Sequence, residues 1–288
     1  MESKSIHKIL VPVDFSETAV NALDYACSLS TVYKSEVIIY HVNEAPILLT
    51  NELAIAADYS VMEKEANDRL KDIQLKMIAK YPLLLCSNSY SVGISSMEIL
   101  KKIETDQIDL VVMGTNGASG ISEVLIGSIT QKVSAESTCP VLVIPAQTSV
   151  HNPEKIVFAT NFDDHELQAI FLLSELVRPF KTEIDVVHIG DAADLKSQNL
   201  KLDYFRGQVT TNISYEKLKF DLVIGDNVEE ALEKFVANNN ADWLAVAKRK
   251  RNFFDRLTST SLSKKLSFHT NVPLLVFHTN PKSGTPFF

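Results

Sequence analysis

The same pattern of segments occurs twice along the chain, and this repeat limits the possible folds more than any other feature. KILVPVDF, which begins at Lys8, recurs as KIVFATNF from Lys155, an offset of 147 residues. CPVLVI recurs later as VPLLVF, at an offset of 133 residues. Self-similarity over half the chain predicts two copies of one fold, in domains 1–147 and 152–288. The joint between them, AQTSVHNPE, is polar and contains a proline, as is typical of a linker.

Within each copy, short apolar runs alternate with segments that have helical spacing. The expected strands of the first copy are 7–15, 36–42, 87–92, 110–113 and 141–145. The expected helices lie between them, at 17–33, 58–80, 94–105 and 128–137. Apolar strands that alternate with helices indicate an α/β fold, in which a parallel sheet is covered on both faces. We expect two tandem doubly wound, Rossmann-like sheets, each five-stranded with strand order 3-2-1-4-5.

The two offsets differ by 14 residues, and the difference falls between the second and fourth strands. We therefore expect the long charged helix at 58–80 to be cut short in the second copy. The last strands, 141–145 and 274–278, are equivalent short apolar segments, and an exposed edge strand invites pairing with another strand. We expect the halves to pack through them as an intramolecular pseudo-dimer, and a further homodimer between chains is plausible.

Residues 111–130, VVMGTNGASGISEVLIGSIT, contain four of the nine glycines of the chain. They follow an apolar run and precede a helical pattern. In the expected strand order they lie next to Asp14, which ends the first strand, at the point where such sheets bind ligands. A glycine-rich turn before a helix exposes N–H groups, and without a Cβ it lets a phosphate come close. Since Asp14 can accept hydrogen bonds from ribose hydroxyls or an adenine amino group, the two features predict a nucleotide site.

The glycine segment also has a purely structural interpretation. Glycines are common in loops, and Ser128 with Gln131 three residues later has the form of a capping box. Two classes of nucleotide-binding protein are excluded, because the segment matches neither the Walker A motif, which ends in G-K-[ST], nor the dinucleotide motif G-x-G-x-x-G.

Five segments resemble the universal stress protein family: VPVDFS (11–16), YHV (40–42), MGTNG (113–117), GSIT (127–130) and CPVLVIP (139–145). The glycine spacing is similar to the ATP-binding motif of that family, and the outline of both halves is similar to a tandem member. The resemblance implies bound ATP or another adenine nucleotide. Mg²⁺ or Mn²⁺, if present, would be held mainly by phosphate oxygens, since no carboxylate cluster is evident. The site residues that it implies are Pro12, Val13, Asp14, Val42, Met113, Gly114, Asn116, Gly117, Gly127, Ser128, Ile129 and Thr130.

The second copy departs from this pattern. Ala247, Lys250 and Thr260 stand where the first copy has glycines, and Asn161 replaces the aspartate. Side chains then occupy positions where backbone should approach a phosphate, so we expect this copy to have lost ATP binding. Trp243, in its fourth strand, is expected in the core.

Other polar residues invite a functional interpretation but have a simpler structural one. His41 and His188 recur at equivalent positions in both copies, and a residue kept where the site is lost is expected to be structural. Asp109 recurs as Asp242 before a strand and is expected to anchor it locally. The basic run at 248–251 is interpreted as a solvated loop, with an anion site as the alternative.

Composition narrows the class of protein. A net charge of −8 argues against nucleic-acid binding, which usually needs a basic face. No apolar run approaches the roughly 20 residues that a membrane helix needs. Three scattered cysteines are too few for a disulfide framework, so a cytoplasmic location is expected.

Two functions fit these features: a regulatory module that binds ATP, and a slow ATP hydrolase of the same fold. The sequence offers no base poised near the phosphates and no carboxylate pair for metals, so we assign no catalytic or metal-binding residue and favour binding. A ligand-free structural pseudo-dimer is a third alternative, which the intact motif of the first copy disfavours.

Overall fold

The computed structural model describes residues 6–44, 59–115, 126–249 and 272–279. In the first half, the strands are β1 (Lys8–Pro12), β2 (Glu36–Glu44), β3 (Leu85–Gly93), β4 (Leu110–Gly114) and β5 (Val141–Ile144), and the helices are α1 (Glu17–Tyr33), α2 (Tyr59–Lys80), α3 (Ser95–Thr105) and α4 (Ser128–Glu136). In the second half, the strands are β6 (Lys155–Ala159), β7 (Glu183–Gly190), β8 (Leu218–Ile224), β9 (Trp243–Arg249) and β10 (Leu274–Thr279). The helices there are α5 (Glu166–Val177), α6 (Leu195–Asn212) and α7 (Val228–Asn238), with short 3-10 helices η1 (Arg178–Phe180) and η2 (Ala192–Asp194).

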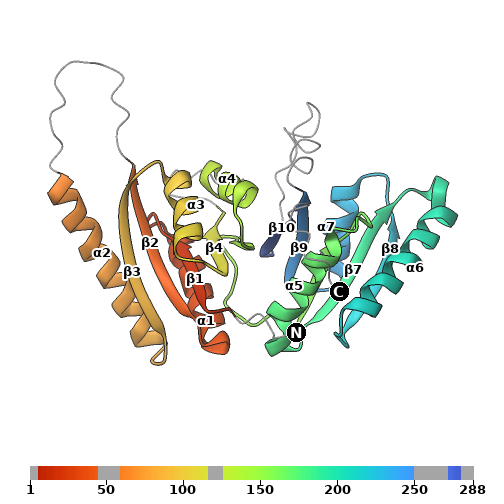
Figure 1. Ribbon diagram of the computed structural model, residues 1–288, viewed down its shortest axis with the longest axis horizontal. Helices are drawn as coiled ribbons and strands as arrows, with labels where there is room; N and C mark the ends of the chain where they lie inside the picture. Colours follow the sequence, from red (N-terminus) through yellow and green to blue (C-terminus); the bar gives the residue numbers. More distant parts are fainter. Residues whose placement is uncertain (1–5, 45–58, 116–125, 250–271, 280–288) are drawn as a thin grey trace, which may run out of the picture.

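Over the described residues, all ten strands form one sheet, in the order β3-β2-β1-β4-β5-β10-β9-β6-β7-β8. Figure 1 shows β3 and β8 toward opposite ends of the molecule, with β10 near its middle. Each half has the predicted order 3-2-1-4-5 when it is read from its outer edge inward, so the predicted fold is confirmed. Strands within each half pair in parallel, as doubly wound sheets require.

The two halves join where β5 pairs with β10, and this is the antiparallel step of the sheet. Val143 lies opposite Leu274, and Leu142 lies opposite Leu275. The side chains of all four are buried. This pairing confirms that the last strands of the two copies pack against each other within one chain.

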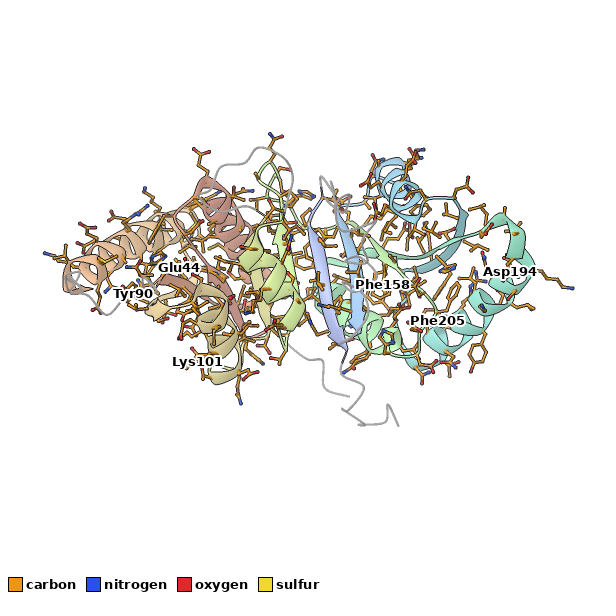
Figure 2. The ribbon with its side chains drawn as sticks, turned by 90° about the horizontal axis from the view of Figure 1, so that it is seen from above. Glu44, Tyr90, Lys101, Phe158, Asp194 and Phe205 are labelled. Atoms are coloured by element: carbon orange, nitrogen blue, oxygen red, sulfur yellow. The ribbon has the colours of Figure 1, made fainter. Side chains whose placement is uncertain are left out.

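Two apolar layers cover the sheet, because successive strand residues point to opposite faces. On β1, Ile9 and Val11 belong to the layer beneath α1, α2, α5 and α6, and Leu10 belongs to the layer beneath α3, α4 and α7. In the second half, Phe158 of β6 and Phe205 of α6 are both buried in the first of these layers (Figure 2). Among the described helices, none combines the length and the apolar character needed to span a bilayer.

Helix α1 also packs against the second half, beside α5 (Figure 1). The indole Nε1 of Trp243 donates a hydrogen bond to the Tyr25 hydroxyl at 2.8 Å, and both side chains are fully buried. The Tyr33 hydroxyl donates to the carbonyl oxygen of Leu176 at 3.0 Å. The core position expected for Trp243 is therefore confirmed, and its polar atom links the two halves.

The basic run at 248–251 begins inside β9, so the loop interpretation is wrong for Lys248 and Arg249. Lys248 lies in β9 and is buried, and its Nζ donates to the carbonyl oxygen of Ala135 at 3.1 Å. That carbonyl lies in the last turn of α4, where a cation is favoured. Lys250 and Arg251 lie outside the described residues.

Two equivalent aspartates anchor the first strand of each half. Asp109 Oδ2 accepts hydrogen bonds from the backbone N–H groups of His7 (2.9 Å) and Lys8 (3.1 Å). Asp242 Oδ2 accepts the equivalent pair of hydrogen bonds in the second half, one of them from Lys155 N at 2.8 Å. The predicted anchoring role is confirmed, but the expectation that it is local is wrong, because the two aspartates hold strands 101 and 87 residues away in the sequence.

The expected shortening of the long charged helix is largely wrong. Helix α2 has 22 residues and its counterpart α6 still has 18. Most of the length difference lies in the connection before the helix, which runs over 45–58 in the first half and over 191–194 in the second. Loops accept insertions at lower free-energy cost than packed helices do.

We expect Gly207→Ala to raise the free energy of unfolding by about 0.5–1 kcal/mol, because glycine in a helix interior costs about that much relative to alanine. Gly207 lies inside α6, and a Cβ built there meets no atom within 4 Å. Urea denaturation followed by circular dichroism measures the change. Gly225→Ala is the control and should destabilise, since its Cβ would lie 2.6 Å from that of Ala231. A destabilised Gly207→Ala protein would contradict the prediction.

Candidate nucleotide-binding site

A cavity of about 230 Å³ opens beyond the carboxyl ends of β1 and β4, at the predicted switch point of the first half. Every predicted site residue that the structure describes lines it, and Asn116 and Gly117 lie outside the described residues. Four further residues that the sequence reasoning missed complete the wall. The described lining consists of Pro12, Val13, Asp14, Ala19, Tyr40, Val42, Ser95, Ile99, Met113, Gly114, Gly127, Ser128, Ile129 and Thr130.

The second half has two larger and more open grooves, of about 690 and 530 Å³, along α6 and the start of α5. The smaller one reaches Asn161, the counterpart of Asp14, but no described residue of β9 lines either groove. The smaller cavity of the first half is therefore the candidate site, because sheet topology and the glycine segment both converge on it.

The end of β1 holds Asp14 in a fixed turn. Val13 N donates to the Tyr40 carbonyl at 2.8 Å, which extends the pairing of β1 with β2 by one residue. Asp14 Oδ1 then accepts from the backbone N–H (3.0 Å) and the hydroxyl (2.6 Å) of Ser16. Ser16 also caps α1, by accepting from Ala19 N at 3.2 Å. The turn thus orients an exposed carboxylate at the mouth of the cavity.

The two ends of the glycine segment are tied together at the cavity rim. Gly127 N donates to the carbonyl oxygen of Thr115 at 2.6 Å, which closes the base of the 116–125 connection. The Thr130 hydroxyl donates to the carbonyl oxygen of Gly114 at 3.0 Å and joins the first turn of α4 to the end of β4. These bonds place the start of α4 directly beside the carboxyl end of the strand.

Helix α4 starts at the cavity without a side-chain cap. Its N-cap is Gly127, with φ of −59°, and the expected capping box of Ser128 and Gln131 does not form. Gln131 Nε2 instead donates to the carbonyl oxygen of Ile126 at 2.8 Å. The first N–H groups of an α-helix have no partner within the helix, and with the helix dipole they favour an anion.

Gly114 has a second reason to be glycine that the sequence did not reveal. A Cβ at this position would lie 2.7 Å from Cγ2 of Thr18 and 3.1 Å from the Thr18 backbone. The first turn of α1 therefore packs against this glycine, which is a structural reason for it beside phosphate approach. The second half accepts Ala247 at the equivalent position, where α5 begins two residues later in the repeat than α1 does.

The missed wall residues come from tertiary packing. Ala19 lies in the first turn of α1, and Ser95 and Ile99 lie on α3 across the cavity. Tyr40 is buried and its hydroxyl is hydrogen-bonded to Ser91. Burial raises the pKa of the Tyr40 hydroxyl, so it stays neutral. Helical spacing could show which residues share a face of α3, but no sequence signal says which end of that face meets β4.

The two equivalent histidines are structural. His41 Nδ1 lies 2.7 Å from the carbonyl oxygen of Val13, and its ring packs against Phe15 with centroids 4.5 Å apart. His188 makes the equivalent contact in the second half, where its Nδ1 lies 2.7 Å from the carbonyl oxygen of Thr160. A carbonyl only accepts, so Nδ1 carries the proton in both rings. Since the same bond occurs in both halves, it supports the turn after the first strand and needs no ligand.

Comparison with known proteins agrees with this geometry. The family model described as "Universal stress protein family" matches residues 5–145 and again 153–278. The chain belongs to the universal stress protein family. As a member with two matched regions, it carries the family fold twice, which agrees with the repeat and with the two halves of the sheet.

Curated relatives carry one copy where this chain carries two. Universal stress protein YxiE of Bacillus subtilis is 31% identical over 147 residues, which cover 48% of this chain and 98% of that protein. Universal stress protein MJ0577 of Methanocaldococcus jannaschii is 31% identical over 156 residues, which cover 49% of this chain and 96% of that protein. A universal stress protein of Archaeoglobus fulgidus has a similar solved structure, with a TM-score of 0.74 at 18% identity, covering 96% of this chain and all of that chain.

Proposed function

We propose that the first half of this universal stress protein binds one adenine nucleotide, and that its occupancy regulates the shape or the partners of the chain in a stress response. The observation that carries the proposal is the convergence of Asp14, the ends of the glycine segment and the uncapped start of α4 on one cavity. The cytoplasmic location and a homodimer of chains stay predictions from the sequence.

The chemistry of the wall selects a ligand with three unlike parts. Val13, Ile99 and Met113 offer apolar contact to a flat ring. The Asp14 carboxylate accepts hydrogen bonds and repels anions, so it suits ribose hydroxyls rather than phosphates. The start of α4 favours an anion at the other side. A nucleoside with phosphates combines all three features.

The cavity is too small to enclose the whole of such a ligand. Its 230 Å³ is below the range of about 300–1,000 Å³ usual for small-molecule pockets. We infer that it encloses the base and ribose, while the phosphates extend to the start of α4. Asp14 is the single carboxylate in the described lining, so Mg²⁺ or Mn²⁺ would be held mainly by phosphate oxygens.

Hydrolysis of ATP is the alternative function. A hydrolase needs a base that can reach the attacking water. In the described lining the ionisable side chains are Asp14, which is oriented by Ser16, and Tyr40, which is kept neutral by burial. Neither lies at the start of α4, where the phosphates are proposed, so binding without rapid turnover is the function we favour.

The proposal predicts that Gly127→Val weakens ATP binding at least about tenfold, because the added side chain stands where the phosphates approach α4. The φ of −59° at Gly127 suits any residue, so the backbone can keep its path. Gly127→Ser is the matched control: serine is small and a preferred N-cap, so it should lose less affinity. Competition against a fluorescent ATP analogue measures all three proteins. An unmodified chain that binds no ATP, or equal affinities for wild type and Gly127→Val, would overturn the proposal.

A further inference from the structure

The second half differs from the first at a residue that lines the cavity. Ala19 lines it in the first half, and the repeat places Glu166 at the equivalent position. The register between them has no gap: Phe15 and Phe162 both have positive φ (65° and 62°) and both pack against the equivalent histidines. A methyl group in one half is thus replaced by a carboxylate in the other.

The Glu166 side chain points into the interior of the second half. It is 3% exposed, although glutamate is rarely buried. The Thr160 hydroxyl donates to Oε2, and Asn161 N donates to the same oxygen at 3.1 Å. Thr160 and Asn161 are the counterparts of Val13 and Asp14, so the carboxylate lies against the wall that borders the cavity in the first half.

The local fold makes room for this contact. Helix α1 is capped by Ser16, whereas the equivalent segment of the second half forms a tight turn in which Glu166 N donates to the carbonyl oxygen of Asp163 at 2.9 Å. Helix α5 therefore begins at Glu166 itself. A side chain in the first position of a helix can reach back to the preceding loop, as a capping residue does.

We propose that Glu166 acts as an internal ligand, whose carboxylate occupies the place beside Thr160 and Asn161 where a nucleotide would lie in a second-half site, and so blocks nucleotide binding there. Its oxygens accept hydrogen bonds at the end of β6, as the oxygens of a bound nucleotide can at the end of β1. This inference rests on the proposed function of the first half, and it adds a closing residue to the loss of glycines.

Transfer of the arrangement to the first half tests the proposal. In the full chain, Val13→Thr/Ala19→Glu should weaken binding of ATP at least about tenfold, because the carboxylate fills the cavity and repels an anion. Thr31→Glu, which adds a carboxylate to an exposed position of the same helix away from the cavity, is the control and should stay within about threefold of wild type. The inference is overturned if wild type binds ATP and the Val13→Thr/Ala19→Glu protein binds it with the same affinity. A wild type that binds no ATP would instead overturn the proposed function.

A second measurement tests the contact in the native half and does not depend on nucleotide. In Glu166→Ala, the amide of Asn161 loses its acceptor, so its hydrogen exchange should become at least about tenfold faster. The amide of Lys155, which donates to Asp242, is the internal control and should keep its rate. Unchanged exchange at Asn161 would overturn the inference, whether or not the first-half variant folds.

Discussion

Replacement of Trp243 by alanine is expected to lower the free energy of unfolding by about 3–5 kcal/mol, the usual cost of removing a large buried aromatic side chain. Trp243 is fully buried in β9, and its ring lies 6.4 Å from that of Tyr25 on α1. The change removes packing in the second half and a hydrogen bond to the first. Because Trp243 is the single tryptophan of the chain, unfolding should be followed by circular dichroism rather than by fluorescence.

Trp243→Phe separates the contribution of apolar packing from that of the hydrogen bond to Tyr25. Phenylalanine keeps most of the apolar volume but leaves the buried Tyr25 hydroxyl without its donor, so we expect a smaller loss of about 1–3 kcal/mol. Tyr25→Phe should cost a similar amount, and the double variant should cost less than the sum, because both single changes break one bond. A loss below about 1 kcal/mol in Trp243→Ala would show that the halves do not depend on this contact.

The second large effect expected is on the pH dependence of stability. Burial raises the pKa of the Glu166 carboxyl from 4.5 to about 7. The folded protein therefore holds a proton between these values that the unfolded chain has released, and stability falls as the pH rises through this window. Since one pKa unit corresponds to about 1.4 kcal/mol, the loss amounts to about 3 kcal/mol by pH 8.

Glu166→Gln should remove this dependence, because an amide does not titrate. The difference in the free energy of unfolding between Glu166→Gln and wild type should be smallest near pH 4.5 and should grow by about 3 kcal/mol in favour of the variant toward pH 8. Urea denaturation across this pH range measures it. Asp163, whose charge also raises the pKa, and His165 adjoin the carboxyl, and both stay unchanged in the variant. Glu104→Gln, on an exposed face of α3, is the control. Parallel pH profiles for wild type and Glu166→Gln would contradict the prediction.

Much of the fold could be predicted because its signals are local or repeated. The alternation of apolar runs and helical spacing fixes the strand order once the doubly wound rule is applied. The two offsets of the repeat identify equivalent residues, so the shared roles of Asp109 and Asp242 follow from the sequence. Pairing of β5 with β10 follows from two short apolar strands at equivalent edges.

The parts that could not be predicted depend on contacts between distant segments. The capping box of Ser128 failed because Gly127 already serves as N-cap and Gln131 turns back to Ile126. The packing of Thr18 on Gly114 and the burial of Lys248 against α4 require knowledge of how helices meet strands. No periodicity carries that information.

Glu166 is the most informative case of this kind. In the sequence it is one acidic residue at the start of an amphipathic segment, where a first-turn glutamate is ordinary. Its function depends on the equivalence with Ala19, which the repeat supplies, and on its burial, which only the structure supplies.

The presence of both copies in one chain has a physical consequence for the interface. Because a linker joins them, pairing of β5 with β10 is intramolecular, and a weak interface would still be closed at any protein concentration. One half can then lose its ligand site without losing its part in the sheet. Under the proposed function, the chain thus has one half that binds nucleotide and one half that supports it.

The stoichiometry of ATP binding shows whether one half or both halves bind nucleotide. Isothermal titration calorimetry of the full chain with ATP and Mg²⁺ should give about one site per chain, since the glycine segment is intact in the first half and replaced at Ala247, Lys250 and Thr260 in the second. The same titration of Gly127→Val should lose that site. Two equivalent sites per chain, or a single site that survives in Gly127→Val, would contradict the account.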